Sequence, residues 1–195
     1  MFWLTDPRTQ CEHPVSKLTE QSDETLAAEA AREGSDGPAF VELLGRYRER
    51  VWRICYRLLG HADDAQDAAQ EVFVRLFTGR NKFDGRSKYS TWVHGVAVRT
   101  CLMLRRSRGR RQRHEAAAAR NSQTLVESPE PGLSLDLDQM LDQLDEEDRA
   151  LVILKYCESY SYEELAEMFG LSAAACKMRV SRAKEKIQRE FSPEV

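Results

Sequence analysis

The stretch of residues 161–187 constrains the fold most, because it carries the start and stop signals of two consecutive helices. Ser161 and Glu164 have the spacing of a capping box, so a helix should begin directly after Ser161. Gly170 can adopt the left-handed conformation that ends a helix, and Ser172 can cap a second one. A short capped helix, a glycine turn and a second helix are typical of a helix-turn-helix.

The second of these helices has two contrasting faces. Cys176, Val180, Ala183 and Ile187 repeat at helical spacing and should pack against the first helix. The opposite face is small, polar and cationic, and consists of Ala174, Lys177, Met178, Ser181 and Arg182. Small residues allow close approach to a DNA duplex, and cations bind its phosphates. The pattern also suits an ordinary amphipathic hairpin with a solvated face, and the hairpin alone does not decide between the two.

Charge is separated along the chain, although the net charge is only −3. Residues 85–114 contain no acidic side chain, and residues 127–148 contain no basic one. The net charge argues against a uniformly basic nucleic-acid binder, whereas the separation predicts distinct surfaces for distinct partners. No apolar run approaches the roughly 20 residues that cross a bilayer, and the five cysteines are scattered, so we expect a cytoplasmic protein with reduced thiols.

The apolar periodicity predicts an all-α protein of two small helical domains joined by a flexible linker. Helices are expected over residues 24–33, 39–59, 64–77 and 91–106, the third of them capped by Asp63. The predicted division is a flexible extension (1–22), a first helical domain (23–108), a linker (109–134) and a second domain (135–191).

Two further clusters could bind partners. The loop before the fourth helix and the start of that helix combine cations with aromatic side chains, namely Lys82, Phe83, Arg86, Lys88, Tyr89 and Trp92. Aromatic rings beside cations can stack on unpaired bases, which favours melted or single-stranded nucleic acid. Alternatively, Phe83, Tyr89 and Trp92 close the helical core and the cations are solvated.

The third expected helix presents an acidic and amide face of Asp64, Asp67, Gln70 and Glu71. This face is either solvated or a docking surface for a basic protein partner. No nucleotide-binding loop or catalytic triad accompanies it, so we expect neither an enzyme nor a cofactor. Cys11 and His13 lack a second pair at zinc spacing, so no metal site is expected either.

Taken together, these segments resemble the extracytoplasmic-function (ECF) sigma factors of bacterial RNA polymerase. The resemblance rests on DDAQDAAQEVFVRLF, FDGRSKYSTWVHGVAVRTCLMLRR and LDQLDEEDRALVILKYCESYSYEELAEMFGLSAAACKMRVSRAKEKI. It covers sigma region 2, from about residue 24 to 108, and sigma region 4, from about 135 to 191. A stand-alone helix-turn-helix regulator is the alternative, but such a regulator has no need for the acidic helix or the aromatic loop.

The resemblance implies a role for each cluster. The partners of the protein would be core RNA polymerase, promoter DNA and an anti-sigma factor. Core polymerase would be contacted through the clamp of its largest subunit and through the flap. Polymerase binding is assigned to Asp64, Asp67, Gln70 and Glu71. The melted −10 element is assigned to Lys82, Arg86, Lys88, Tyr89, Trp92, Arg99, Arg105 and Arg106. The −35 duplex is assigned to Ser172, Ala174, Lys177, Met178, Ser181 and Arg182.

Overall fold

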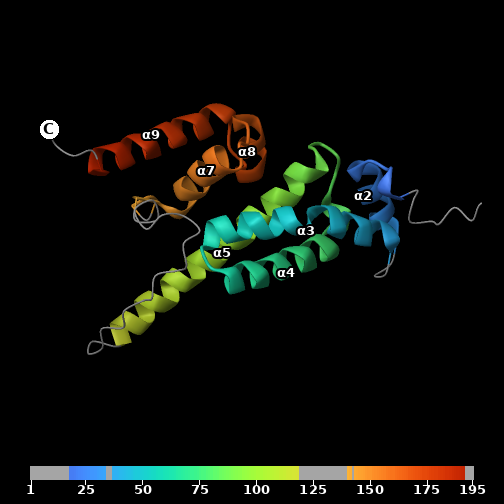
Figure 1. Ribbon diagram of the computed structural model, residues 1–195, viewed down its shortest axis with the longest axis horizontal. Coiled ribbons are helices and arrows are strands. Elements are labelled where there is room, and N and C mark those ends of the chain that lie inside the picture. Colours follow the sequence, from blue (N-terminus) through green and yellow to red (C-terminus); the bar gives the residue numbers. More distant parts are fainter. Residues whose placement is uncertain (1–17, 34–36, 119–139, 142, 192–195) are drawn as a thin grey trace, which may run out of the picture.

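A computed structural model describes residues 18–33, 37–118, 140–141 and 143–191, and within these residues all regular structure is helical (Figure 1). The expected N-terminal extension lies almost wholly outside the described residues, as do Cys11, His13 and residues 119–134 of the expected linker. No described helix is long and apolar enough to span a membrane.

Four helices form the N-terminal body: α2 (Asp23–Arg32), α3 (Pro38–Leu59), α4 (Ala62–Thr78) and α5 (Tyr89–Ala118). The Ser22 side chain caps α2 by accepting a hydrogen bond from the Thr25 amide, and Gly60 ends α3 with a positive φ of 82°. Apolar side chains at helical spacing, among them Val51, Ile54 and Val72, are fully buried between the helices. The helical signals in the sequence are therefore confirmed for this body.

Two predicted boundaries were wrong. The fourth helix does not end near residue 106 but continues to Ala118, so residues 109–118 of the expected linker are helical. This segment is rich in arginine and alanine, which favour helix, and contains no proline. The third helix begins at Ala62, and His61 rather than Asp63 occupies the N-cap position. Asp63 lies in the first helical turn, where the helix dipole stabilises a carboxylate.

The C-terminal body consists of α7 (Glu146–Cys157), α8 (Tyr162–Phe169) and α9 (Ala173–Phe191). The Asp145 side chain caps α7, and Ser161 and Glu164 form the predicted capping box on α8. Gly170 ends α8 with φ of 68°, and the Ser172 hydroxyl accepts a hydrogen bond from the Ala175 amide. The helix-turn-helix geometry expected from the sequence is confirmed.

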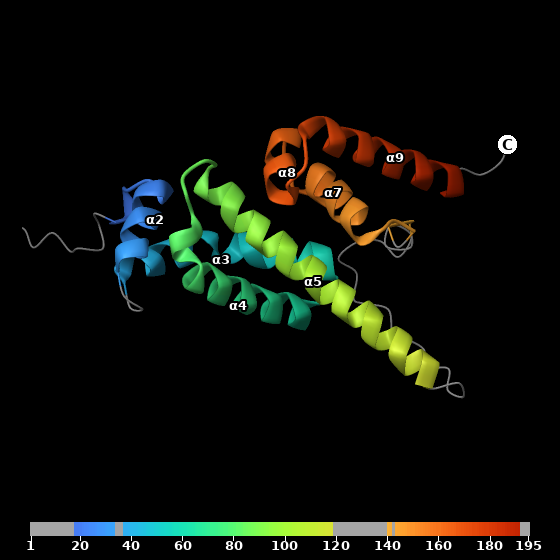
Figure 2. The ribbon, with the colours of Figure 1, turned by 180° about the vertical axis from the view of Figure 1, so that it is seen from behind.

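The two bodies pack against each other, which the sequence analysis did not anticipate. The C-terminal body lies over α3 and α5, with α8 against α5 and α7 against both (Figures 1 and 2). Buried residues of both bodies form one continuous core. Met168 of α8 is almost fully buried, and a Cβ built on Gly95 of α5 would lie 3.5 Å from its Cα. A methyl group at position 95 would therefore just contact α8, and a longer side chain would meet it.

Candidate functional site

The outer face of α9 is open to solvent. All six residues assigned to duplex DNA from Ser172 to Arg182 are exposed, and Met178 retains 52% of its accessible surface. On the inner face, Cys176, Val180 and Ala183 are buried. The two predicted faces of the helix therefore exist.

Arg179 of α9 is turned away from that face. Its guanidinium contacts Asp148 at 2.5 Å and Glu147 at 2.9 Å near the start of α7. Hydrogen bonds from Arg179 and Arg106 lower the pKa of Glu147 below its usual value. Arg179 therefore fixes α9 to α7.

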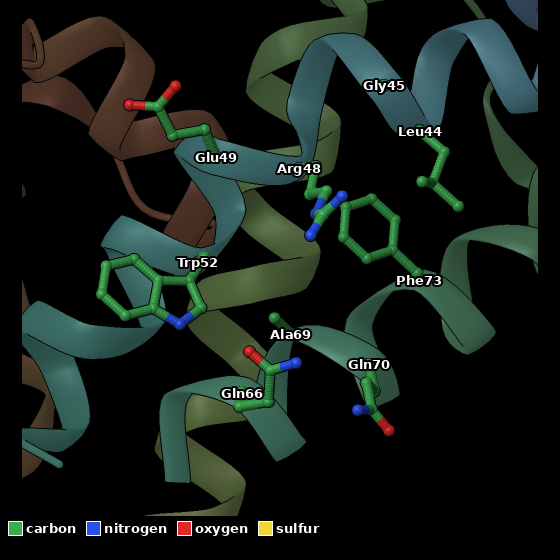
Figure 3. Close-up of a pocket in the computed structure, with 9 residues that line it drawn as sticks. All are labelled: Leu44, Gly45, Arg48, Glu49, Trp52, Gln66, Ala69, Gln70 and Phe73. Carbon is green, nitrogen blue, oxygen red and sulfur yellow. The ribbon is translucent and has the colours of Figure 1, made fainter. Parts of the chain in front are cut away.

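The acidic face of α4 borders a groove between α3 and α4. The groove has a volume of 610 Å³ and is lined by Leu44, Gly45, Arg48, Glu49, Trp52, Gln66, Ala69, Gln70 and Phe73 (Figure 3). Of the four predicted polymerase-binding residues, Gln70 lies in the groove and Asp67 is exposed on the same helix. The sequence analysis missed the α3 wall, in which Arg48 and Trp52 are one helical turn apart.

The other two residues of the acidic face already have partners. Both Asp64 carboxylate oxygens accept hydrogen bonds from Arg108 of α5, which lowers the pKa of Asp64. Glu71 forms an ion pair with Arg75 one turn away at 2.6 Å. Asp64 and Glu71 are therefore engaged within the chain, whereas Asp67 and Gln70 are exposed beside the groove.

The aromatic side chains around the loop before α5 form a cluster. The ring centroids of Phe83, Tyr89 and Trp92 lie 5.1–5.7 Å from one another. Tyr89 is only 4% exposed and packs edge-to-face on Tyr47, so the structure places it in the core rather than on a surface that could stack on a base. Phe83 and Trp92 are half-buried beside it.

The predicted cations of this loop are all at the surface. Lys82 and Lys88 are exposed. Arg86 is exposed as well and forms a salt bridge with Asp84, and this contact lowers the pKa of Asp84. The loop therefore offers exposed positive charge beside the partly exposed ring of Trp92.

The arginines of α5 that were predicted to bind DNA contact the C-terminal body as well as solvent. Arg99 donates a hydrogen bond to the Met168 carbonyl oxygen at 3.0 Å. Arg105 and Arg106 form salt bridges with Glu146 and Glu147 of α7 respectively. The basic and acidic segments that are separated in the sequence thus meet in the folded chain.

A buried polar pair lies at the centre of this interface. His94 of α5 is 5% exposed, and its Nδ1 lies 2.8 Å from the hydroxyl oxygen of Tyr160 in the C-terminal body. Burial, reinforced by the nearby positive charge of Arg50, lowers the pKa of His94 from 6.5 to about 4. The histidine is therefore neutral at pH 7.

Comparison with known proteins identifies both bodies. Residues 43–111 match the family Sigma-70 region 2, and residues 134–187 match Sigma-70, region 4. The chain is 31% identical over 183 residues to the ECF RNA polymerase sigma factor SigE of Mycolicibacterium smegmatis, covering 89% of this chain and 70% of that protein. It is 29% identical over 171 residues to the ECF RNA polymerase sigma factor SigW of Bacillus subtilis, covering 80% of this chain and 90% of that protein.

The fold has a solved counterpart. The sigma factor RpoE of Bartonella quintana, crystallised with the anti-sigma factor NepR, superposes with a TM-score of 0.58 at 22% identity. The match covers 80% of this chain and 98% of that one. At this identity the likeness concerns the arrangement of the helices.

Proposed function

Since this chain belongs to the ECF RNA polymerase sigma factors, we propose that it binds core RNA polymerase through α4 and directs it to promoters through α9 and the α5 region. Sigma factors are not enzymes, so the role is one of binding and placement. The observation that carries the proposal is the outer face of α9. It presents small, polar and cationic side chains to solvent on a helix whose start and inner face are both fixed.

In this proposal α9 enters the major groove of the −35 duplex. Lys177 and Arg182 are exposed and lie close enough along α9 to reach one stretch of the groove. Ser172 and Ala174 lie at the N-terminal end of the helix, where main-chain amides and the helix dipole favour a phosphate. Met178 supplies an apolar contact surface.

The melted −10 strand is assigned to the loop before α5 and to the first part of that helix. Lys82, Arg86 and Lys88 would contact phosphates, and Trp92 would contact an unstacked base. Tyr89 supports the ring cluster from the core and is no longer assigned a direct contact. Arg99, Arg105 and Arg106 would give up their contacts with the C-terminal body on binding phosphates, although Arg99 and Arg106 are already exposed.

The groove between α3 and α4 is proposed to bind the clamp of the polymerase's largest subunit. Asp67 and Gln70 would supply polar contacts at its rim, while Trp52 and Phe73 supply apolar area. An anti-sigma factor is a further proposed partner, supported by the solved structure of the related fold with the anti-sigma factor NepR.

Transcription from a promoter with defined −35 and −10 elements tests the proposal. Core RNA polymerase should initiate only when this protein is added. Asp67→Lys combined with Glu71→Lys should weaken polymerase binding at least about tenfold, because two exposed anions of the α4 face, one of them paired with Arg75, become cations. The matched control is Glu163→Lys with Glu167→Lys, which has the same spacing on exposed positions of α8.

Two results would contradict the assignment. Initiation by core polymerase that is the same with and without the protein would exclude a sigma factor. Promoter binding that needs no polymerase, together with unchanged behaviour of the Asp67 and Glu71 variant, would indicate a stand-alone regulator.

A further inference from the structure

A buried carboxylate from the C-terminal body sits among three arginines of α3. The Glu158 side chain is 5% exposed and lies 3.8 Å from Arg50, 3.7 Å from Arg53 and 2.6 Å from Arg57. These arginines occupy one face of α3, because they are spaced three and four residues apart. We call Arg50, Arg53 and Arg57 the arginine row.

The backbone holds Glu158 in this place. Glu158 follows the last residue of α7, and the next residue, Ser159, has a φ of +58°, which a side-chain-bearing residue adopts at a cost. This turn lets Glu158 reach α3 while Tyr160 is buried against His94 and under the guanidinium of Arg50. Glu158 and Tyr160 therefore attach the same turn of the C-terminal body to the N-terminal body.

The arginine row shares one buried carboxylate, while Glu49 contacts Arg53 and the charge of Glu164 acts on Arg50. Three guanidinium groups share the Glu158 carboxylate, and the additional contact of Arg53 is to Glu49, which is 90% exposed and 3.9 Å away. Seven residues of α-helix rise about 10 Å, a length along which a nucleic-acid strand carries two or three phosphates. The length of the arginine row therefore matches two or three consecutive phosphates of one strand, which is more than a single carboxylate requires.

The arginine row also continues into the cationic face of α5. Arg105 of α5 donates a hydrogen bond to the Leu58 carbonyl oxygen, directly beside Arg57 in the sequence of α3. Arg105 and Arg106 form salt bridges with Glu146 and Glu147, which are 36% and 38% exposed and thus more open than Glu158. Acidic side chains of the C-terminal body therefore pair with cations of both α3 and α5.

We propose that the arginine row binds the phosphates of promoter DNA, and that Glu158 occupies the row while the two bodies are packed together. This inference rests on the proposed function, because it extends the −10 surface from α5 onto α3. Separation of the bodies releases the row, whose side chains are already 33–40% exposed, and the α5 arginines from their carboxylate partners at the same time. A DNA strand rather than an acidic protein is favoured because the row adjoins residues already assigned to the −10 strand.

Binding of a fluorescein-labelled single-stranded oligonucleotide of about 12 nucleotides to the full chain, measured by anisotropy without polymerase, tests this inference. Glu158→Gln keeps the side-chain shape and removes the charge, and should tighten binding about tenfold. Adding Arg50→Gln, Arg53→Gln and Arg57→Gln should abolish this gain. It should also make the slope of log affinity against log salt shallower by about 2, as expected when three phosphate contacts are lost.

Matched controls separate the arginine row from general charge effects. Glu163→Gln removes one exposed carboxylate from α8 and should leave DNA binding unchanged. Arg32→Gln removes one exposed arginine at the end of α2 and should not reverse the gain. If the triple arginine variant does not fold by circular dichroism, the single Arg53→Gln and Arg57→Gln variants should each remove part of the gain.

Three outcomes would overturn the inference. They are no gain with Glu158→Gln, a gain that persists without the arginines, and tighter binding of poly-glutamate with no change for DNA, which would identify an acidic protein as the occupant. Each leaves the proposed function standing if the wild-type chain still supports polymerase-dependent initiation, since the anisotropy measurement contains no polymerase.

Discussion

The outer face of α9 and the cationic face of α5 are both assigned to DNA, yet the structure leaves them in opposite states. Lys177 and Arg182 of α9 are exposed. Arg105 and Arg106 of α5 are engaged by Glu146 and Glu147. The cations of the proposed −35 face are exposed, whereas Arg105 and Arg106 are paired with carboxylates of the body that carries α9, although Arg106 keeps 53% of its side-chain surface.

This difference shows that positive charge in a sequence does not establish a free binding surface. The −35 surface depends only on the local fold of the helix-turn-helix, so it is complete in the isolated chain. The α5 part of the proposed −10 surface is freed of its contacts only by separation of the two packed bodies, whereas Lys82, Arg86 and Lys88 of the loop are already exposed. Binding to polymerase could supply the free energy for that separation, because a ligand favours the state that it binds more tightly.

The largest effect is expected for charge reversal on the open face. Lys177→Glu with Arg182→Glu should weaken −35-dependent initiation about 100-fold or more, because two contacts to an anionic duplex become repulsive. Binding to core polymerase should be unchanged. Initiation by the complete polymerase assembly on a promoter with a −35 element measures the effect.

The matched control is Lys184→Glu with Arg189→Glu, which repeats the charge change and its spacing on exposed positions further along α9. Normal initiation by the Lys177 and Arg182 variant would show that the open face of α9 does not bind the −35 element. The contrast between α9 and α5 as DNA-binding surfaces would then no longer hold.

A smaller effect is expected when the C-terminal body is moved away from the cationic face of α5 by an uncharged substitution. A Cβ on Gly95 would lie 3.1 Å from the Arg99 guanidinium and 3.5 Å from Met168, so Gly95→Leu should force α8 away from α5. The radius of gyration measured by small-angle X-ray scattering should increase, and single-stranded DNA should bind several-fold more tightly.

Gly45→Leu is the control, since a Cβ on Gly45 of α3 meets no atom within 4 Å. An unchanged radius of gyration in the Gly95 variant would mean that the packing of α8 on α5 tolerates the added side chain, and that the −10 surface is covered by other contacts.

The smallest effect is expected from pH. Because the pKa of His94 is lowered from 6.5 to about 4 in the folded chain, the unfolded chain takes up more protons as the pH falls below about 6.5. Stability should therefore fall with decreasing pH, by about 1 kcal/mol between pH 7 and 5.5. Urea unfolding at several pH values measures this dependence.

His94→Gln should remove this part of the pH dependence, while other titrating groups remain. The charges that face His94 are those of Arg50 and Glu164, and Tyr160 is its hydrogen-bond partner. The outer face of α9 carries no histidine, so duplex binding should vary less over this range. An identical pH dependence in wild type and variant would contradict the predicted proton uptake.

Much of the fold could be predicted because its signals are local. The Ser161 and Glu164 capping box, the glycine at position 170 and the apolar stripe containing Val180 each depend on residues within a few positions of one another. The end of α5 could not be predicted in the same way, because the arginine-rich segment after residue 106 has good helix formers but no apolar period.

Among the proposed functional surfaces, those that depend on local sequence signals were predicted and those that depend on long-range packing were not. The exposed residues of α9 follow from helical spacing alone, as Lys177 and Arg182 show. The burial of Tyr89 depends on Tyr47, and the α3 wall of the groove, including Trp52, depends on how α3 and α4 pack. Contacts between residues far apart in the chain leave no periodic signal.

The sequence by itself determined that this chain is helical, that it ends in a helix-turn-helix and that its charges are separated by segment, since each property is local or additive along the chain. Only the tertiary structure decided that Glu158 lies among Arg50, Arg53 and Arg57 and that Arg106 pairs with Glu147. The physical reason is that a charge has no preferred partner until packing places one within a few ångströms, where the attraction is strong and water screens it least.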